Sequence, residues 1–124
     1  MTVNAIYILL ALFLLWMLYK QFAPVSGLRN LTPQQFKSEY KGNKLVDVRE
    51  SHEFKGGHIT GAVNIPLSQL SKRLGEIPQE RQVYLYCQSG MRSKQAAMLL
   101  SRSGYSQLAH LRGGILTWNG PTHK

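Results

Sequence analysis

The sequence contains one cysteine, Cys87, and the six residues that begin with it read CQSGMR. Gly90 permits a tight loop whose backbone N–H groups turn inward to bind an anion. The helix expected after this loop directs the positive end of its dipole at the same point, and Arg92 adds a permanent positive charge. All three features favour the thiolate, which is the nucleophilic form of cysteine. The segment therefore predicts a nucleophilic cysteine in an anion-binding loop.

A less reactive interpretation of the same residues also exists. A lone cysteine beside an apolar strand is more often a small buried hydrophobic residue than a nucleophile. Arg92 is alternatively a solvated residue in the first turn of a helix, although a positive charge at that position opposes the helix dipole. We favour the reactive interpretation because the glycine, the helix start and the arginine all lie within one short segment beside the thiol.

The length of the loop separates two kinds of cysteine chemistry. The spacing from Cys87 to Arg92 is C-x4-R, one residue shorter than the C-x5-R loop of phosphatases that use a cysteine nucleophile. A shorter loop forms a smaller bowl, suited to a single additional sulfur atom on the cysteine rather than to a whole phosphate. The sequence also offers no evident aspartate as a general acid for a phosphate ester. A phosphatase or an arsenate reductase is therefore disfavoured.

Composition excludes several other classes of protein. A chain of 124 residues has room for one domain, not for separate cofactor and substrate domains. One cysteine rules out an intrachain disulfide and a cysteine-built zinc site, and the four histidines lack metal-ligand spacing. The formal net charge of +9 favours anionic partners. The basic residues form no run, which disfavours nucleic acid as a partner.

The elements that must position Cys87 alternate between strands and helices. We expect strands at 44–48, 62–65, 83–86 and 107–111, and helices at 32–40, 67–74, 93–102 and 114–118. Thr32, Pro33 and Gln35 have the residue types of a helix start. The strand at 83–86 is apolar throughout, which is typical of a strand buried on both faces. The alternation predicts an α/β fold with a parallel sheet, in which ligands bind at the carboxyl ends of strands.

The first part of the chain differs in character from the rest. Residues 3–19 contain one strongly polar side chain, that of Asn4, and form a helix of about 25 Å if each residue adds about 1.5 Å. A cleaved signal peptide would begin with basic residues and end at a small-residue site, and a buried core helix would have a polar face. Neither feature is strong in this segment, so we favour a membrane anchor over these two alternatives.

We therefore expect residues 1–23 to form a transmembrane anchor that meets the lipid bilayer through residues 3–22. Residues 24–30 would form a linker and residues 31–124 one domain. Basic side chains flank the apolar segment on its C-terminal side only, at Lys20, Arg29, Lys37, Lys41 and Lys44. The positive-inside rule then predicts a single-pass protein whose domain lies in the cytoplasm, a location that suits a chain without disulfides.

Several stretches of the expected domain together carry a family resemblance. They are Leu45–Glu50 (LVDVRE), Gly57–Pro66 (GHITGAVNIP), Cys87–Ser93 (CQSGMRS) and Leu111–Ile115 (LRGGI). In combination these stretches resemble the signatures of the rhodanese family, over about residues 30–120. The apolar N-terminal segment lies outside the family pattern.

The resemblance implies a small parallel sheet flanked by helices and a sulfurtransferase activity. Cys87 would take a sulfane sulfur from a small anionic donor such as thiosulfate, hold it as a persulfide, and pass it to a thiol or cyanide acceptor, without a metal or organic cofactor. Backbone N–H groups would cradle the persulfide at Gln88, Ser89, Gly90, Met91 and Arg92, and Arg92 would help to hold the charge. A non-catalytic, membrane-tethered module for binding or sulfide sensing is the alternative.

Other residues near the expected active face have less specific interpretations. Arg49, at the end of a strand, is a candidate substrate contact, although an ion pair with Glu50 or Glu53 is at least as well supported. We expect His58 to be a hydrogen-bonding structural residue rather than an acid or base. Gly113-Gly114 is expected to let the backbone pass close to the loop after Cys87.

Overall fold

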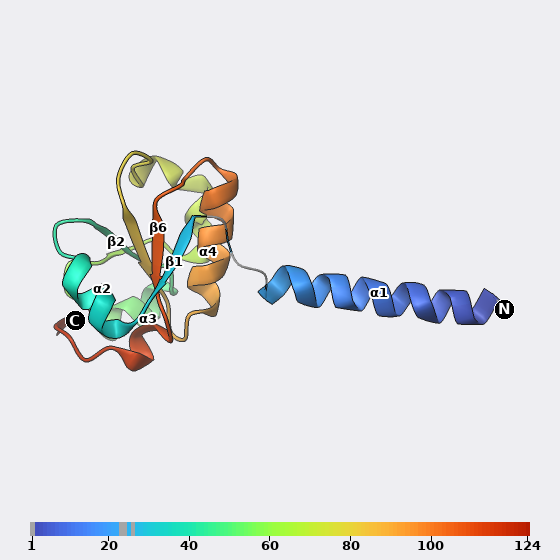
Figure 1. Ribbon diagram of the computed structural model, residues 1–124. Helices are drawn as coiled ribbons and strands as arrows, with labels where there is room; N and C mark the ends of the chain where they lie inside the picture. The colour runs from blue at the N-terminus through green and yellow to red at the C-terminus, as the bar shows by residue number, and fades with distance from the viewer. Residues whose placement is uncertain (1, 23–24, 26) are drawn as a thin grey trace.

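A five-stranded parallel sheet forms the centre of the computed structural model, which describes residues 2–22, 25 and 27–124 (Figure 1). The strands are β1 (Leu28–Leu31), β2 (Lys44–Asp47), β3 (His58–Ile59), β4 (Val63–Asn64), β5 (Val83–Tyr86), β6 (Leu108–Leu111) and β7 (Thr122–His123). The helices are α1 (Thr2–Phe22), α2 (Pro33–Glu39), α3 (Ser51–Lys55) and α4 (Met91–Arg102). Short 3-10 helices are η1 (Leu67–Lys72), η2 (Leu74–Glu76) and η3 (Gly114–Thr117).

The order of the parallel sheet is β1-β6-β5-β2-β4, and β3 and β7 form a separate antiparallel pair. One face packs against α4 and η1 through a core that includes Leu70, Ala97 and Leu100. The opposite face packs against α2 through Phe36, with Tyr84 of β5 in the same cluster. All four residues of β5 are buried, as expected for an apolar strand covered on both faces. The expected α/β fold with a parallel sheet flanked by helices is confirmed.

Local signals in the sequence explain where several elements begin. The Thr32 hydroxyl accepts a hydrogen bond from the Gln35 backbone N–H at 3.2 Å, and the Gln35 side chain accepts one from the Thr32 backbone N–H at 3.0 Å. This reciprocal capping box starts α2 where the sequence predicts a helix. The helix expected at 67–74 is instead two short 3-10 helices, η1 and η2. The helix expected from residue 93 starts two residues earlier, directly after Gly90.

The sheet begins earlier in the chain than expected. Residues 28–30, assigned to the linker at 24–30, are the first three residues of β1. β1 pairs only with β6 in the sheet order, and an edge strand of this kind does not need the apolar pattern of a central strand. Its two middle residues, Arg29 and Asn30, are exposed, which concealed the strand in the sequence. The expected anchor–linker boundary at residues 23 and 24 lies outside the described residues.

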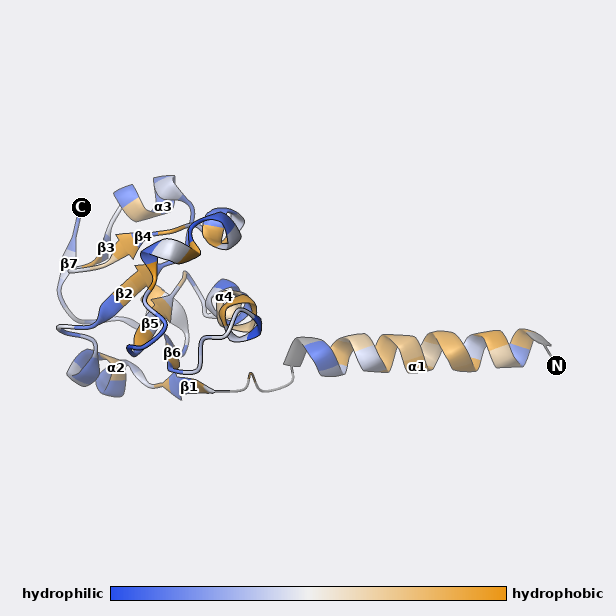
Figure 2. Ribbon diagram, turned by 90° about the horizontal axis from the view of Figure 1, so that it is seen from above, coloured by the Kyte–Doolittle hydropathy of each residue, from blue (hydrophilic) through white to orange (hydrophobic). Residues whose placement is uncertain are grey.

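The N-terminal helix α1 is apolar over most of its length, as Figure 2 shows, and it has no separate polar face. The window Val3–Lys20 is long and apolar enough to cross a membrane, and none of it is buried against the rest of the protein. With 21 residues, α1 is about 32 Å long at ~1.5 Å per residue, close to the ~30 Å of a hydrocarbon core. The helix thus extends beyond the apolar run of 17 residues from which its length was expected. A membrane span and a signal sequence both satisfy this description.

The 3-10 helix η3 packs directly on the loop that follows β5. The Ile115 backbone N–H donates to the Cys87 carbonyl at 2.9 Å, and the Leu116 N–H donates to the Gln88 carbonyl at 3.3 Å. Gly114 has φ +67°, and a Cβ atom there would lie 2.3 Å from the Gln88 carbonyl oxygen. The expectation that Gly113-Gly114 lets the backbone approach the loop is therefore confirmed.

We expect Gly114→Ala to destabilise the protein more than Gly42→Ala. Both glycines have positive φ, but a Cβ at Gly42 would meet nothing within 4 Å. The strained φ costs about 1–2 kcal/mol in both variants, and the clash with the loop adds roughly 1–3 kcal/mol in Gly114→Ala. Denaturant unfolding of the full chain in detergent measures the difference. Equal losses in the two variants would contradict the close packing of η3 on the loop.

Candidate active site

The Cys87 sulfur lies at the carboxyl end of β5, the central strand, and the residue is only 1% exposed. Its Sγ accepts hydrogen bonds from the backbone N–H of Gly90 at 3.0 Å and of Ser93 at 3.3 Å. Gly90 directs its N–H inward with φ +105°, a conformation that favours glycine. Two N–H donors aimed at one buried sulfur stabilise negative charge on that atom. Gly90 therefore lies where the sequence predicts, while Ser93 joins the site from the first turn of α4.

The other residues of the loop differ in how far their side chains are exposed. The side chains of Ser89 and Met91 are exposed, so any contribution from these residues to an anion-binding cradle comes from the backbone. Gln88 is half-buried, and its carbonyl accepts the hydrogen bond from η3. The loop is consequently fixed by the protein on its inner side and open to solvent on its outer side.

Arg92 is held by an ion pair with Glu53 of α3. Its two terminal nitrogens donate to the two carboxylate oxygens at 2.7 and 2.9 Å. Glu53 also accepts from the backbone N–H of Glu50 at 3.0 Å, which closes the N-terminal turn of α3. The hydrogen bond from Arg92 lowers the pKa of Glu53 to about 2. The guanidinium charge of Arg92 is thus held against α3 by Glu53 and is only partly solvated.

Arg49 has a different partner from the two expected. It donates from Nε and Nη2 to the Asp47 carboxylate at 2.7 to 3.1 Å, rather than to Glu50 or Glu53. Its Nη1 donates to Gln88 Oε1 at 3.3 Å, which ties the pair to the loop. The Asp47 side chain is fully buried and Arg49 is 4% exposed, so the pair forms inside the domain. These contacts support the inner side of the loop, and the expected substrate contact of Arg49 stays a prediction.

His58 lies beside α3 and not at the sulfur. Its Nδ1 is 3.0 Å from the Phe54 carbonyl, and its ring stacks on the Phe54 ring with centroids 3.7 Å apart. These contacts agree with the structural role expected for this histidine.

Sequence reasoning missed a group of polar residues behind the sulfur. Ser93 Oγ lies 3.6 Å from Cys87 Sγ and 2.9 Å from His110 Nδ1. His110 Nε2 in turn contacts the Asn30 side-chain oxygen. The sequence contained partial signals only: Ser93 belongs to the stretch CQSGMRS, whereas His110 has no ligand spacing and Asn30 fell in the expected linker. Their proximity depends on the pairing of β1 with β6 and on the position of α4 above them.

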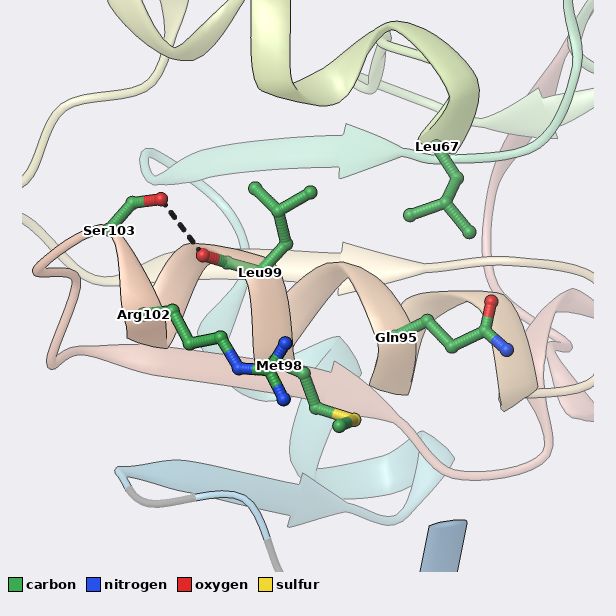
Figure 3. Close-up of a pocket in the computed structure, with 6 residues that line it drawn as sticks. All are labelled: Leu67, Gln95, Met98, Leu99, Arg102 and Ser103. Carbon is green, nitrogen blue, oxygen red and sulfur yellow. Dashed lines mark hydrogen bonds between the residues drawn. The ribbon is translucent and has the colours of Figure 1, made fainter. Parts of the chain in front are cut away.

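A groove lies beside α4, away from Cys87. This groove of about 480 Å³ is lined by Leu67, Gln95, Met98, Leu99, Arg102 and Ser103 (Figure 3). Arg102 and Ser103 lie at the C-terminal end of α4, whereas Cys87 precedes its N-terminus. Within residues 2–22, 25 and 27–124, no group of three or more His, Cys, Asp or Glu side chains could hold a metal ion.

We expect Glu53→Gln to lower the free energy of unfolding at pH 7 by on the order of 1 kcal/mol, because the ion pair with Arg92 is lost. A carboxylate whose pKa is depressed by folding contributes stability above its unfolded pKa, and that stability is lost as the pH falls through the folded pKa of about 2. The wild type should therefore lose more stability than the variant between about pH 5 and pH 2. Thermal unfolding across this range measures the effect.

Glu76→Gln is a matched control, because Glu76 forms a similar two-bond pair with Arg73 at 2.7 and 2.9 Å on the surface. Its side chain is 51% exposed, against 24% for Glu53. A control variant that lost as much stability as Glu53→Gln would contradict a special role for the pair at the active-site loop.

Comparisons with known proteins agree with this geometry. A family model described as "Rhodanese-like domain" matches residues 32–120. An uncharacterized protein of Bacillus subtilis, YqhL, is 42% identical over 115 residues, which cover 93% of this chain and 91% of that protein. The thiosulfate sulfurtransferase GlpE of Shewanella oneidensis is 30% identical over 97 residues, which cover 77% of this chain and 96% of that protein.

The fold is also similar to that of solved structures. The crystal structure of a rhodanese-related protein from Thermoplasma volcanium superposes with a TM-score of 0.71 at 28% identity, covering 77% of this chain and 97% of that one. The residues that the family model matches include the whole of the loop from Cys87 to Ser93. The buried cysteine with its N–H donors, the parallel sheet and the family model together show that this chain belongs to the rhodanese-like family.

Proposed function

We propose that the protein is a membrane-anchored sulfurtransferase in which Cys87 carries the transferred sulfur as a persulfide. The donor is a small anion of the thiosulfate type, and the acceptor is a thiol or cyanide. One observation carries the proposal: the Cys87 sulfur lies at the end of the central strand with two backbone N–H groups directed at it. Its family is the second support.

In the first half-reaction the Cys87 thiolate attacks the outer sulfur of the donor. A new S–S bond forms, the S–S bond within the donor breaks, and the remainder of the donor leaves with the bonding electrons, as sulfite when the donor is thiosulfate. The negative charge then resides on the persulfide at the mouth of the loop. In this proposal the backbone N–H groups of Gln88, Ser89, Gly90, Met91 and Arg92 receive that charge, which is electrostatic stabilisation by preorganised donors.

In the second half-reaction the acceptor attacks the outer sulfur and Cys87 leaves as a thiolate. The N–H groups of Gly90 and Ser93 stabilise this leaving group at 3.0 and 3.3 Å. Cys87 is the only cysteine of the chain, so no second thiol of the same chain is available to accept the sulfur. The acceptor must therefore come from outside the chain.

Arg92 supplies a permanent positive charge near the site. The hydrogen bonds to Glu53 raise the pKa of Arg92, and the Cys87 charge acts in the same direction. Glu53 fixes the guanidinium group by two hydrogen bonds and offsets part of its charge. Arg92 thus attracts a small anionic donor without leaving a bare cation at the mouth of the loop.

We expect Cys87→Ser to abolish sulfur transfer and to leave the fold intact, because serine fits the same space but is a far weaker nucleophile at neutral pH. Wild-type protein treated with thiosulfate should gain the mass of one sulfur atom in intact mass spectrometry, and Cys87→Ser should not. Turnover in Cys87→Ser would contradict the persulfide mechanism. A stable mass gain without turnover to cyanide or thiols would instead favour the non-catalytic, sulfide-sensing module.

We also propose that residues 1–23 anchor the protein in a bilayer, with the domain at residues 31–124 in the cytoplasm. The helix α1 has the length and composition of a membrane span. The alignment with the Bacillus subtilis relative covers 115 of 124 residues, so it leaves nine outside, fewer than the 21 residues of α1. The similarity therefore extends into α1. Basic residues follow α1 at Arg29, Lys37, Lys41 and Lys44, which supports the proposed orientation.

The orientation is testable with a membrane-impermeant maleimide. Cys87 is 1% exposed and reacts poorly with a bulky maleimide, so we place cysteines near the two ends of the chain in a Cys87→Ser background. Lys124→Cys should be labelled only after cell lysis, whereas Thr2→Cys, which precedes the bilayer residues 3–22, should be labelled in intact cells. Alkaline carbonate should leave the full chain in the membrane. Labelling of Lys124→Cys in intact cells would reverse the orientation, and release of a shortened soluble chain would identify a cleaved signal peptide.

A further inference from the structure

A line of hydrogen-bonding groups runs from the active-site sulfur to the edge of the sheet. Ser93 Oγ lies between Cys87 Sγ, at 3.6 Å, and His110 Nδ1, at 2.9 Å. On its other side, His110 Nε2 contacts the Asn30 side-chain oxygen. Asn30 and His110 are register partners on β1 and β6, so their side chains lie on the same face of the sheet, the face that α4 covers.

The burial of these groups calls for an explanation. His110 is 5% exposed and Ser93 is fully buried, while the other buried polar side chains, Asp47 and Arg49, form an ion pair with each other. Burial of an imidazole costs free energy that a leucine at the same position would avoid. Burial also lowers the pKa of His110 to about 4, and the positive charges of Lys94 and Arg112 act in the same direction. The ring is therefore neutral at pH 7, with one donor nitrogen and one acceptor nitrogen.

Burial of Cys87 creates a need that this line of groups meets. The residue is 1% exposed, so little water contacts the thiol in the resting structure, and its proton must leave before the sulfur can act as a nucleophile. Asn30, at the other end of the line, is exposed on the edge strand β1. The line thus connects a buried thiol to solvent.

We propose that Ser93, His110 and Asn30 form a proton relay that allows the buried Cys87 thiol to ionise and then directs the Ser93 hydroxyl at the thiolate. The thiol proton passes to Ser93 Oγ, the Ser93 proton passes to His110 Nδ1, and the proton on Nε2 passes to solvent water at β1 as the Asn30 oxygen, its partner in the structure, turns away. The S–H and Nε2–H bonds break, a Nδ1–H bond forms, and the serine keeps one proton. The Asn30 amide rotates so that its N–H₂ group donates to Nε2.

The relay leaves the histidine neutral in both states, in agreement with its burial. Before ionisation the Ser93 hydroxyl has two acceptors within reach, the Gly90 carbonyl oxygen at 3.1 Å and His110 Nδ1 at 2.9 Å. Afterwards it points towards the sulfur, without a shift of the backbone. His110 touches neither the sulfur nor a substrate position, so it is a positioning residue that acts through Ser93. The role of the relay in sulfur transfer rests on the function proposed above. Ionisation of Cys87 can be measured without any sulfur donor.

The test compares two polar substitutions in the full chain. His110→Asn places an amide near the position of Nδ1, where its N–H₂ group donates to Ser93 and keeps the hydroxyl directed at the thiolate, although an amide cannot pass a proton onward. His110→Gln places its amide near the position of Nε2, out of reach of Ser93. The equilibrium amount of thiolate depends on this hydrogen bond and not on the speed of the relay, so the two variants separate the directing role of His110 from a general loss of the imidazole. Alkylation by iodoacetamide at pH 7, followed by intact mass spectrometry, reports the thiolate. We expect His110→Gln to slow alkylation about tenfold, the usual effect of losing a hydrogen bond to a charged group, and His110→Asn to stay within about threefold of wild type.

Leu108→Ala is the matched control, because Leu108 is a fully buried residue of the same strand and lies outside the relay. Loss of packing loosens the domain and exposes the thiol, so this variant should be alkylated at the wild-type rate or faster. A decrease in rate is therefore a change that simple destabilisation does not produce. Circular dichroism and thermal unfolding establish that each variant is folded.

A double-substitution cycle tests whether His110 acts through Ser93. Ser93→Ala combined with His110→Gln should be no slower than Ser93→Ala alone. The proposal is overturned if folded His110→Gln reacts at the wild-type rate, if His110→Asn is as slow as His110→Gln, or if the two losses multiply. If the variants are alkylated as expected but the wild type gains no sulfur from thiosulfate, the proposed function is refuted and the relay stands.

Discussion

A buried sulfur atom that must carry negative charge needs hydrogen-bond donors that are fixed before the charge appears. Much of this structure follows from that constraint. The two N–H groups that face Cys87 are fixed because Gly90 adopts φ +105° and because α4 starts at once after it. The loop is in turn held from outside by η3, whose approach depends on the absence of a side chain at Gly114. Glycine at two separate positions therefore determines the shape of one anion-binding loop.

Two arginines beside the loop form ion pairs and have different roles, one in supporting the loop and one in supplying charge. Arg49 pairs with buried Asp47 and reaches Gln88, so it supports the inner side of the loop. Arg92 pairs with Glu53 at a half-exposed position and supplies charge at the outer side. The buried pair is a structural connection between β2 and the loop, whereas the outer pair adjusts the electrostatic potential that a small anion meets.

The position of the sulfur determines how protons and sulfur atoms reach it. Backbone and side chains enclose Cys87 on the inner side, and the exposed residues Ser89 and Met91 lie on the outer side. A sulfur donor or acceptor approaches from the outer side of the loop. The polar line through Ser93 and His110 leads in another direction, towards the edge strand. Transfer of sulfur and release of the proton thus have separate routes in the proposed mechanism.

The sequence alone determined the parallel α/β fold, the loop that starts at Cys87, the close approach at Gly113-Gly114 and the apolar N-terminal helix, because each depends on neighbouring residues or on a local period. Only the tertiary structure decided which charges pair and which polar groups meet behind the sulfur. The Arg92–Glu53 pair joins residues 39 positions apart, and the His110–Asn30 contact joins residues 80 positions apart. Such contacts depend on strand order and register, and the exposed pattern of the edge strand β1 hid that register in the sequence.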